Sequence, residues 1–300
     1  MTFGSQVTED DARTIVDHCM DVGINSFDTA NVYNKGASET ILGRCLGDRR
    51  KDVVLASKVR GDMGDYSGLS PEAIRRGLED TLRRLGTEYL DLYYLHQPDY
   101  HVPIEETLGT MDDLRQEGKI RYVAYSNYAA WQAMDMLSIS SDRSWSRPSI
   151  CQPMYNLLAR GLEQEFVPFA QAKDVSLIVY NPLAGGLLTG KQSLKTGPET
   201  GTRFDGNEQY LNRYWHPRMF EAVSEIDVAS RTAGRSLLET AFRWLLDKEV
   251  VSSVLVGASS LEQLKANVDA CETAPLNSEL NAACDEAWAQ LRGPVPVYNR

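Results

Sequence analysis

Short apolar runs alternate along the chain with longer segments in which apolar residues recur at every third or fourth position. The apolar runs predict strands at residues 24–28, 53–58, 89–95, 119–125, 149–152, 175–180 and 252–256. The segments with helical spacing predict helices that start after Thr8, Ser38 and Ser70, and further helices at residues 104–117, 129–139, 162–173, 235–247, 260–271 and 277–291. Strands that alternate with helices in this way predict an α/β fold with a parallel sheet.

Three of the predicted helices carry residues that are typical of helix ends. Thr8 and Ser70 each precede an acidic residue in the first turn, and Ser38 is predicted to cap the second helix. Glycines of the kind that end helices follow at Gly23, Gly47 and Gly86. These signals define the helix boundaries beyond what apolar spacing alone provides.

The number of strand and helix pairs favours a closed (β/α)8 TIM barrel, as one domain over residues 1–300, rather than an open sheet. Crossovers between parallel strands are right-handed, and about eight such units close a barrel. No G-x-G-x-x-G motif follows the first strand, which counts against an open dinucleotide-binding sheet. A long loop at residues 184–215 is expected over the active face as a clamp or lid, with a disordered insertion as the alternative, and residues 277–291 predict an extra C-terminal helix.

Composition narrows the class of protein. Lys plus Arg number 31 and Asp plus Glu number 42, so the net charge is −11, which argues against a general nucleic-acid or anionic-membrane partner. The five cysteines show no ligand-like spacing and are expected to be free thiols in a reducing compartment. No signal peptide and no apolar run of 18 residues is found, so a cytoplasmic, soluble protein without a membrane partner is expected.

Four ionisable side chains lie where the first three predicted strands end. Asp28 and Tyr33 follow the first strand, Lys58 ends the second and His96 follows the third. Because parallel strands end at one edge of a sheet, the four groups are expected to converge where α/β barrels hold their active sites. Each residue alone is more often structural than catalytic, but the four together predict an active site.

The four residue types suit proton transfer to an oxygen atom. A tyrosine hydroxyl has a reference pKa of about 10, which is too high for an efficient acid near neutral pH. An ammonium group beside the phenol favours the phenolate and lowers that pKa, while a carboxylate keeps the ammonium charged. A histidine supplies a hydrogen bond to a substrate oxygen. No H-x-H or H-E-x-x-H motif is present, and no metal site is expected.

The segments around these residues resemble the aldo-keto reductase superfamily. The resemblance rests on Phe27-Asp28-Thr29-Ala30 with Tyr33, on Ser57-Lys58, and on Leu90-Asp91-Leu92 followed by His96-Gln97-Pro98. It extends over most of the chain and is greatest for the branch that contains bacterial general reductases and potassium-channel β-subunits. It implies that Tyr33 donates a proton to a carbonyl oxygen as NADPH delivers hydride to the carbon. Lys58 and Asp28 would then tune Tyr33, and His96 would orient the carbonyl.

The same resemblance implies a binding site for NADPH or NADP+ at later strand ends and at the start of the helix at 260–271. Amides would bind the carboxamide, Tyr180 would stack on the nicotinamide, a glycine-rich segment would face the pyrophosphate, and the helix start would bind the 2′-phosphate. A core aromatic residue and a capped surface helix are the structural alternatives. The implied residues are Ser126, Asn127, Gln152, Tyr180, Asn181, Pro182, Leu183, Gly185, Lys191, Arg203, Gly257, Ser259, Gln263 and Asn267.

Two positions depart from the family pattern. Met1-Thr2-Phe3-Gly4 directly precedes the first helix, where the family has a full first strand, so the first strand is expected to be truncated. The chain would then start further upstream, or another segment would fill the gap. Ala266 stands where an acidic residue often occurs, which leaves the choice of NADPH over NADH open, although Lys191 and Arg203 favour the phosphorylated cofactor.

Three functions are compatible with these observations. The leading hypothesis is an NADPH-dependent oxidoreductase that reduces a small aldehyde or ketone to an alcohol. The second is a cofactor-binding regulatory or scaffold subunit with little turnover, and the third is a lyase or isomerase that uses Lys58 as a Schiff base. The carbonyl substrate, the direction in the cell and the number of subunits, including a homo-oligomer, are left open by the sequence.

Overall fold

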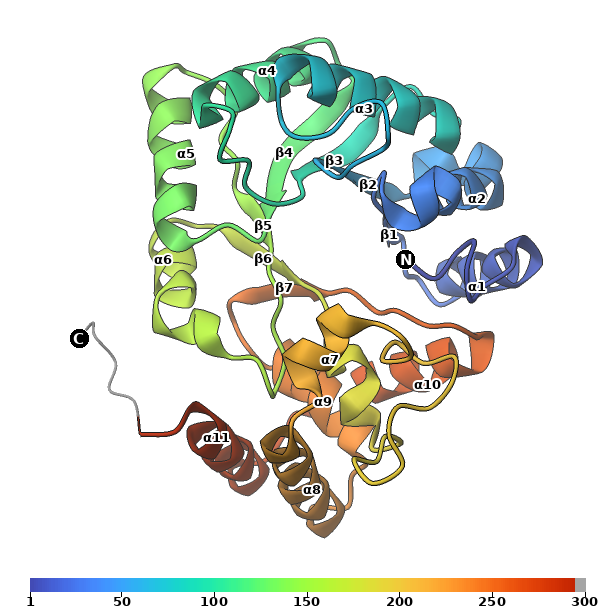
Figure 1. Ribbon diagram of the computed structural model, residues 1–300, viewed down its shortest axis with the longest axis vertical. Coiled ribbons are helices and arrows are strands. Elements are labelled where there is room, and N and C mark those ends of the chain that lie inside the picture. Colours follow the sequence, from blue (N-terminus) through green and yellow to red (C-terminus); the bar gives the residue numbers. More distant parts are fainter. Residues whose placement is uncertain (295–300) are drawn as a thin grey trace. The chain divides into compact units, whose positions relative to one another are not determined.

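Parallel strands that pair in chain order organise the computed structural model, which describes residues 1–294 (Figure 1). Seven strands occur among the described residues, and all lie at or within two residues of their predicted positions: β1 Ser26–Asp28, β2 Val54–Val59, β3 Leu90–Leu95, β4 Ile120–Ser126, β5 Ile150–Gln152, β6 Ser176–Val179 and β7 Val251–Val254. Helices intervene between successive strands. This is the arrangement of the (β/α)8-barrel class, as predicted.

The chain forms two compact units. The first comprises residues 1–153, 174–176 and 258–263, and the second comprises residues 154–173, 177–257 and 264–300. The interpretation of residues 1–300 as a single domain stays a prediction.

Strands β1 to β5 pair side by side in the first unit. Asp28 of β1 lies opposite Ala56 of β2, and Lys58 of β2 lies opposite Tyr94 of β3. All six residues of β3 are buried, as expected for a parallel strand covered on both faces. The helices of this unit are α1 Glu9–Asp21, α2 Ala37–Leu46, α3 Pro71–Leu85, α4 Ile104–Gln116 and α5 Ala130–Asp142, with short 3-10 segments η1 Tyr33–Gly36 and η2 Gly47–Asp52.

Helix ends in the first unit follow the sequence signals with one exception. The Thr8 and Ser70 hydroxyls accept from the backbone amides of Asp11 and Ala73, so both predicted caps are confirmed. The predicted Ser38 cap is wrong, because the N-cap of α2 is Gly36, two residues earlier, and the helix begins at Ala37. Gly36 precedes it with φ of 88°, a conformation that glycine adopts without steric strain, and Ser38 lies inside the first turn.

Residues before α1 form a turn rather than a strand. The Gly4 amide donates to the Val7 carbonyl at 3.0 Å, and Phe3 and Val7 form an isolated bridge. The Thr2 hydroxyl donates to the Ala258 carbonyl at 3.2 Å. The residues before α1 therefore contain no full strand.

The second unit contains β7 and all of β6 except Ser176, and the two strands pair in parallel through Leu177 and Val251. Its helical segments are η3 Gly161–Gln164, α6 Phe166–Ala172, η4 Ala184–Thr189, α7 Glu208–Tyr214, α8 Pro217–Thr232, α9 Leu237–Leu246 and α11 Ser278–Arg292. Helix α10, Leu261–Cys271, begins in the first unit and continues in the second. The predicted C-terminal helix is confirmed as α11.

Aromatic packing holds the last part of the long segment after β6. Phe204 is fully buried, and its ring lies edge-on to Tyr210 and Trp215 at 6.3 Å and 5.0 Å between centroids. Helix α8 follows it and was not predicted, although Pro217 at its first turn and the buried Ala222 and Ile226 are typical helix signals. Among the described residues, no helix combines the length and the apolar character needed to cross a membrane.

Asp91 joins three strands of the first unit at the amino ends of the sheet. It is 4% exposed, and its carboxylate accepts from the Leu55 amide at 2.9 Å and pairs with Arg50 at 2.9 Å and Arg121 at 2.8 Å. The substitution Asp91→Ala should lower the free energy of unfolding by about 2–4 kcal/mol, because it leaves buried donors without an acceptor.

Urea denaturation followed by circular dichroism measures this loss. Asp113→Ala is the control, because Asp113 pairs with Arg75 at 2.9 Å with 60% of its side chain exposed. Its loss should change stability by less than about 0.5 kcal/mol. Equal losses for the two variants would contradict a special role for Asp91.

Candidate active site

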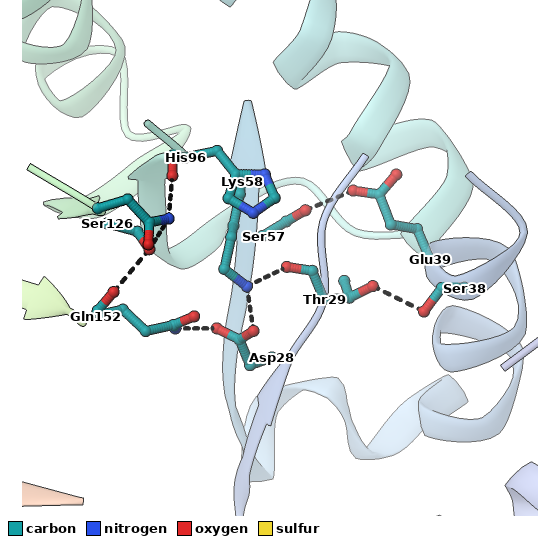
Figure 2. A network of polar contacts seen from close by, with 10 residues as sticks. Asp28, Thr29, Ser38, Glu39, Ser57, Lys58, His96, Ser126 and Gln152 are labelled. Atoms are coloured by element: carbon teal, nitrogen blue, oxygen red, sulfur yellow. Dashed lines mark hydrogen bonds and ion pairs between the residues drawn. The ribbon is translucent and has the colours of Figure 1, made fainter. Parts of the chain in front are cut away.

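A buried ion pair between Lys58 and Asp28 forms the centre of the site in the first unit. The Lys58 ammonium, on β2, contacts the Asp28 carboxylate at the end of β1 and donates to the Thr29 carbonyl at 2.9 Å (Figure 2). The Lys58 side chain is 1% exposed and that of Asp28 is 11% exposed. An amine this deep in a protein stays charged only when a partner compensates its lost hydration.

The surroundings keep Lys58 protonated. Burial alone lowers the pKa of an amine, but the Asp28 carboxylate and the Tyr33 phenol raise the pKa of Lys58 by more, and the net effect is an increase. Lys58 Nζ lies 5.3 Å from the centroid of the Tyr33 ring. The site therefore holds an ammonium ion beside a phenol.

Tyr33 is held by an unusual turn. It opens η1, in which Asn34 and Lys35 both take left-handed conformations, with φ of 50° and 54°. Asparagine tolerates this conformation. The side-chain amide of Asn34 donates to the Phe3 carbonyl at 2.6 Å, which locks the turn. The chain thereby folds back so that Tyr33 approaches Lys58.

His96 completes the predicted group of four. It follows β3, its amide donates to the Val59 carbonyl at 3.0 Å, and its ring lies edge-on to that of Tyr33 with 5.9 Å between centroids. Burial, and then the positive charges of Lys58 and Arg60, lower the pKa of His96 to about 3. The imidazole is therefore neutral at physiological pH and carries one N–H donor.

Residues from β4 and β5 extend this network. The side-chain amide of Gln152 donates to the second oxygen of Asp28 at 2.8 Å. The backbone carbonyl of Gln152 accepts from the Ser126 hydroxyl at 2.7 Å. Asn127 donates to the Ser126 hydroxyl and to the His96 carbonyl, both at 2.9 Å. Figure 2 shows these contacts around Asp28 and Lys58. The ends of five strands are thus joined by polar contacts.

Two contacts in this network were missed by sequence reasoning. The Thr29 carbonyl is a backbone atom, so no side-chain pattern marks it as a partner of Lys58. Gln152 was predicted as a cofactor ligand, whereas the structure shows that it also holds Asp28, 124 residues away in the chain. Such a contact follows only from the register of the strands.

The helix start at α10 carries a compact set of polar contacts. The Ser259 amide and hydroxyl donate to the Gln263 side-chain oxygen at 3.1 and 3.0 Å, and the Gln263 amide donates to the Ser260 hydroxyl at 3.2 Å. Ser259, Ser260 and Gln263 belong to the first unit. Further along α10, in the second unit, Asn267 is 5% exposed and donates to the Gly257 carbonyl at 3.2 Å.

The other predicted cofactor residues lie in the second unit: Tyr180, Asn181, Pro182, Leu183, Gly185, Lys191 and Arg203. Asn181 takes a left-handed conformation with φ of 63°, donates to the Tyr214 hydroxyl at 2.7 Å and accepts from the Gly185 amide at 2.7 Å. Arg203 contacts the Tyr210 hydroxyl at 3.4 Å, and Lys191 is exposed. Asn181 therefore fixes the conformation of the loop after β6. The basic residues Lys191 and Arg203 follow this loop in the chain.

Comparisons with known proteins identify the family of this chain. The model of the aldo/keto reductase family matches residues 1–289. Aflatoxin B1 aldehyde reductase member 2 of Rattus norvegicus is 35% identical, covering 100% of this chain and 86% of its own length. Human aldo-keto reductase family 7 member A3 is also 35% identical, covering 100% of this chain and 95% of its own length.

One relative is named as a channel subunit. It is a probable voltage-gated potassium channel subunit beta of Oryza sativa, which is 34% identical and covers 92% of this chain and 86% of its own length. A family match over nearly the whole sequence, together with relatives above 30% identity that it covers almost end to end, shows that this chain belongs to the aldo/keto reductase family.

Proposed function

We propose that this chain reduces the carbonyl group of a small aldehyde or ketone to an alcohol, with NADPH as the hydride donor. The observation that carries the proposal is a charged Lys58, paired with Asp28, beside the phenol of Tyr33. Family membership and the similarity to proteins named as aldehyde reductases support an oxidoreductase of this kind.

Tyr33 serves as the proton donor in this proposal. The ammonium of Lys58 favours the phenolate that remains after the proton has left, so the phenol becomes a stronger acid. Asp28 keeps the ammonium charged, and Gln152 holds Asp28 through its second oxygen. When bound, NADPH supplies the hydride that ends on the carbonyl carbon, so the proton from Tyr33 completes the alcohol.

His96 orients the substrate. Its imidazole is neutral, since burial and two nearby cations oppose protonation, so its N–H donates to the carbonyl oxygen without a charge of its own. The edge-on contact between the rings of His96 and Tyr33 brings the imidazole and the phenol beside the same proposed substrate position. A carbonyl oxygen held there receives one hydrogen bond from each ring.

Each unit carries polar groups that suit part of an anionic dinucleotide. In the first unit, Ser126, Asn127 and Gln152 are the proposed partners of the carboxamide, and Ser259 and Gln263 at the start of α10 are proposed to meet the 2′-phosphate. In the second unit, the cations Lys191 and Arg203 are proposed to neutralise phosphate groups, and Asn267 to meet the adenine. Tyr180 is the proposed stacking partner of the nicotinamide, beside the loop from Asn181 through Pro182 and Leu183 to Gly185.

A regulatory subunit is the second candidate, favoured by the similarity to the rice protein named as a channel subunit beta. Such a chain would bind NADPH with little turnover. The third hypothesis, a Schiff base on Lys58, is opposed by the structure. The raised pKa of Lys58 keeps the nitrogen protonated, and an ammonium ion is not a nucleophile.

Tyr33→Phe should lower kcat by about 10²–10⁴-fold, because it removes the acid but keeps the ring. NADPH affinity should be unchanged. Steady-state NADPH oxidation with an activated aromatic aldehyde measures the rate, and fluorescence titration measures the affinity. Tyr122→Phe is the control, since Tyr122 is 59% exposed on β4. A Tyr33→Phe enzyme with near-normal kcat would remove Tyr33 as the acid.

The pH dependence tests the state of His96. Because its pKa lies near 3 in the folded chain, kcat/KM should show no inflection near pH 6.5, the ordinary value for histidine, as the pH falls from 8 to 5. The measurement is a pH profile in parallel with His96→Gln. An inflection near pH 6.5 that disappears in His96→Gln would contradict the neutral imidazole.

Gln263→Glu tests the phosphate contact. Glutamate keeps an oxygen to accept from Ser259, so the helix start is preserved while a negative charge is added. NADPH binding should weaken by about tenfold or more, and NADH binding should stay the same. Isothermal titration with both cofactors measures this. Equal losses for the two cofactors would place the 2′-phosphate elsewhere.

A further inference from the structure

Glu39 is a fully buried carboxylate that the proposed reaction does not use. Its side chain is 0% exposed on α2, and each oxygen is occupied. One oxygen accepts from the hydroxyls of Ser57 at 2.5 Å and Thr81 at 2.9 Å. The other accepts from Arg84 at 2.6 Å. Burial removes the hydration of both charges, and apolar residues of the same shape often stabilise a fold as well as such an ion pair does. Stability alone is therefore a weak reason for a charge at this position.

The Ser57 contact connects Glu39 to the backbone of the catalytic lysine. Ser57 directly precedes Lys58 on β2 and is fully buried, and successive residues of a strand point to opposite faces. The hydroxyl of Ser57 therefore fixes β2 to α2 on the face opposite the Lys58 side chain. This hydrogen bond therefore fixes the position of the backbone from which the Lys58 side chain extends.

A second path connects the same helix turn to the ammonium group. Ser38 precedes Glu39, and its hydroxyl lies 3.0 Å from the Thr29 hydroxyl, in a buried contact. The Thr29 carbonyl accepts from Lys58 Nζ at 2.9 Å. Figure 2 shows both paths, from Ser38 to Thr29 and from Glu39 to Ser57. The backbone and the ammonium group of Lys58 are thus both connected, through hydrogen bonds, to one turn of α2.

The partner of Glu39 contacts the turn that carries Tyr33. A Cβ atom on Gly36 would lie 2.7 Å from Cδ and 2.8 Å from Nε of Arg84, so the arginine packs directly on this glycine. Gly36 ends η1, which starts at Tyr33. The Glu39–Arg84 pair therefore contacts both the strand of Lys58 and the turn of Tyr33.

We propose that Glu39, held by Arg84, is a positioning residue that fixes the Tyr33 phenol relative to the Lys58 ammonium. This inference rests on the proposed function, because it concerns the acid of that reaction. Without Glu39 the two groups separate on average, and the ammonium stabilises the phenolate less. Tyr33 then becomes a weaker acid.

Ser57→Ala and Thr81→Val form a matched pair of variants. Each removes one hydroxyl from the same oxygen of Glu39, but only Ser57 adjoins Lys58. A purely structural role predicts similar effects of both. The positioning role predicts that Ser57→Ala raises the titration midpoint of Tyr33 by about half to one pH unit, whereas Thr81→Val leaves it within about 0.2.

The titration is followed by NMR of protein carrying ¹³C-labelled tyrosine rings, with the Tyr33 signal identified by its loss in Tyr33→Phe. This measurement needs neither cofactor nor turnover, so it stays decisive if the chain proves to be no reductase. Turnover of the wild-type chain tests the proposed function separately. With turnover, Ser57→Ala should lower kcat about three- to tenfold and leave KM unchanged.

Ser38→Ala provides a second variant on the other path and should also raise the Tyr33 midpoint. It covers the case in which Ser57→Ala does not fold. Equal shifts in the Ser57, Ser38 and Thr81 variants would overturn the proposal, as would no shift in the first two. Thermal unfolding of all three variants tests whether their stabilities are similar, so that their Tyr33 titration midpoints can be compared.

Discussion

The buried contact between Lys58 and Asp28 is the interaction on which the rest of the site depends. An ammonium ion removed from water is stable only if every polar neighbour is placed to compensate it. This requirement explains why Asp28 is held by Gln152 and why the Thr29 carbonyl turns toward the lysine. The pKa of His96 is lowered first by its burial and then by the charge of Lys58. A single buried charge thereby constrains the polar groups that surround it.

The parallel sheet makes this arrangement accessible to residues that are distant in sequence. Each strand end contributes one or two polar side chains, and pairing in chain order brings them to one edge. The proposed chemistry lies at that edge, whereas the amino ends of the strands carry the Asp91 ion pairs that hold the sheet together. The proposed active site and these stabilising ion pairs therefore occupy opposite ends of the same strands.

Much of this fold was predictable, because apolar spacing reports which face of an element is buried. The strands, most helices and the convergence of Asp28, Lys58 and His96 followed from that pattern. Long-range contacts did not, since the bond from Gln152 to Asp28 depends on strand register. The start of α2 was misplaced because Ser38 is the more typical capping residue, whereas the helix begins after Gly36, which takes a left-handed conformation. Helix α7 lies within the segment 184–215 that was interpreted as a loop, and helix α8, directly after that segment, was not predicted.

The five cysteines have a consequence for how this chain opens. All are unpaired, and burial raises the pKa of each thiol, to about 11 for Cys19 and Cys271. Only the thiolate reacts readily with alkylating reagents, so the folded chain is slow to be labelled. Cys19, Cys45 and Cys151 lie in the first unit, and Cys271 and Cys284 in the second. The rates at which these cysteines are alkylated therefore report separately on each unit, and they show whether one unit opens before the other.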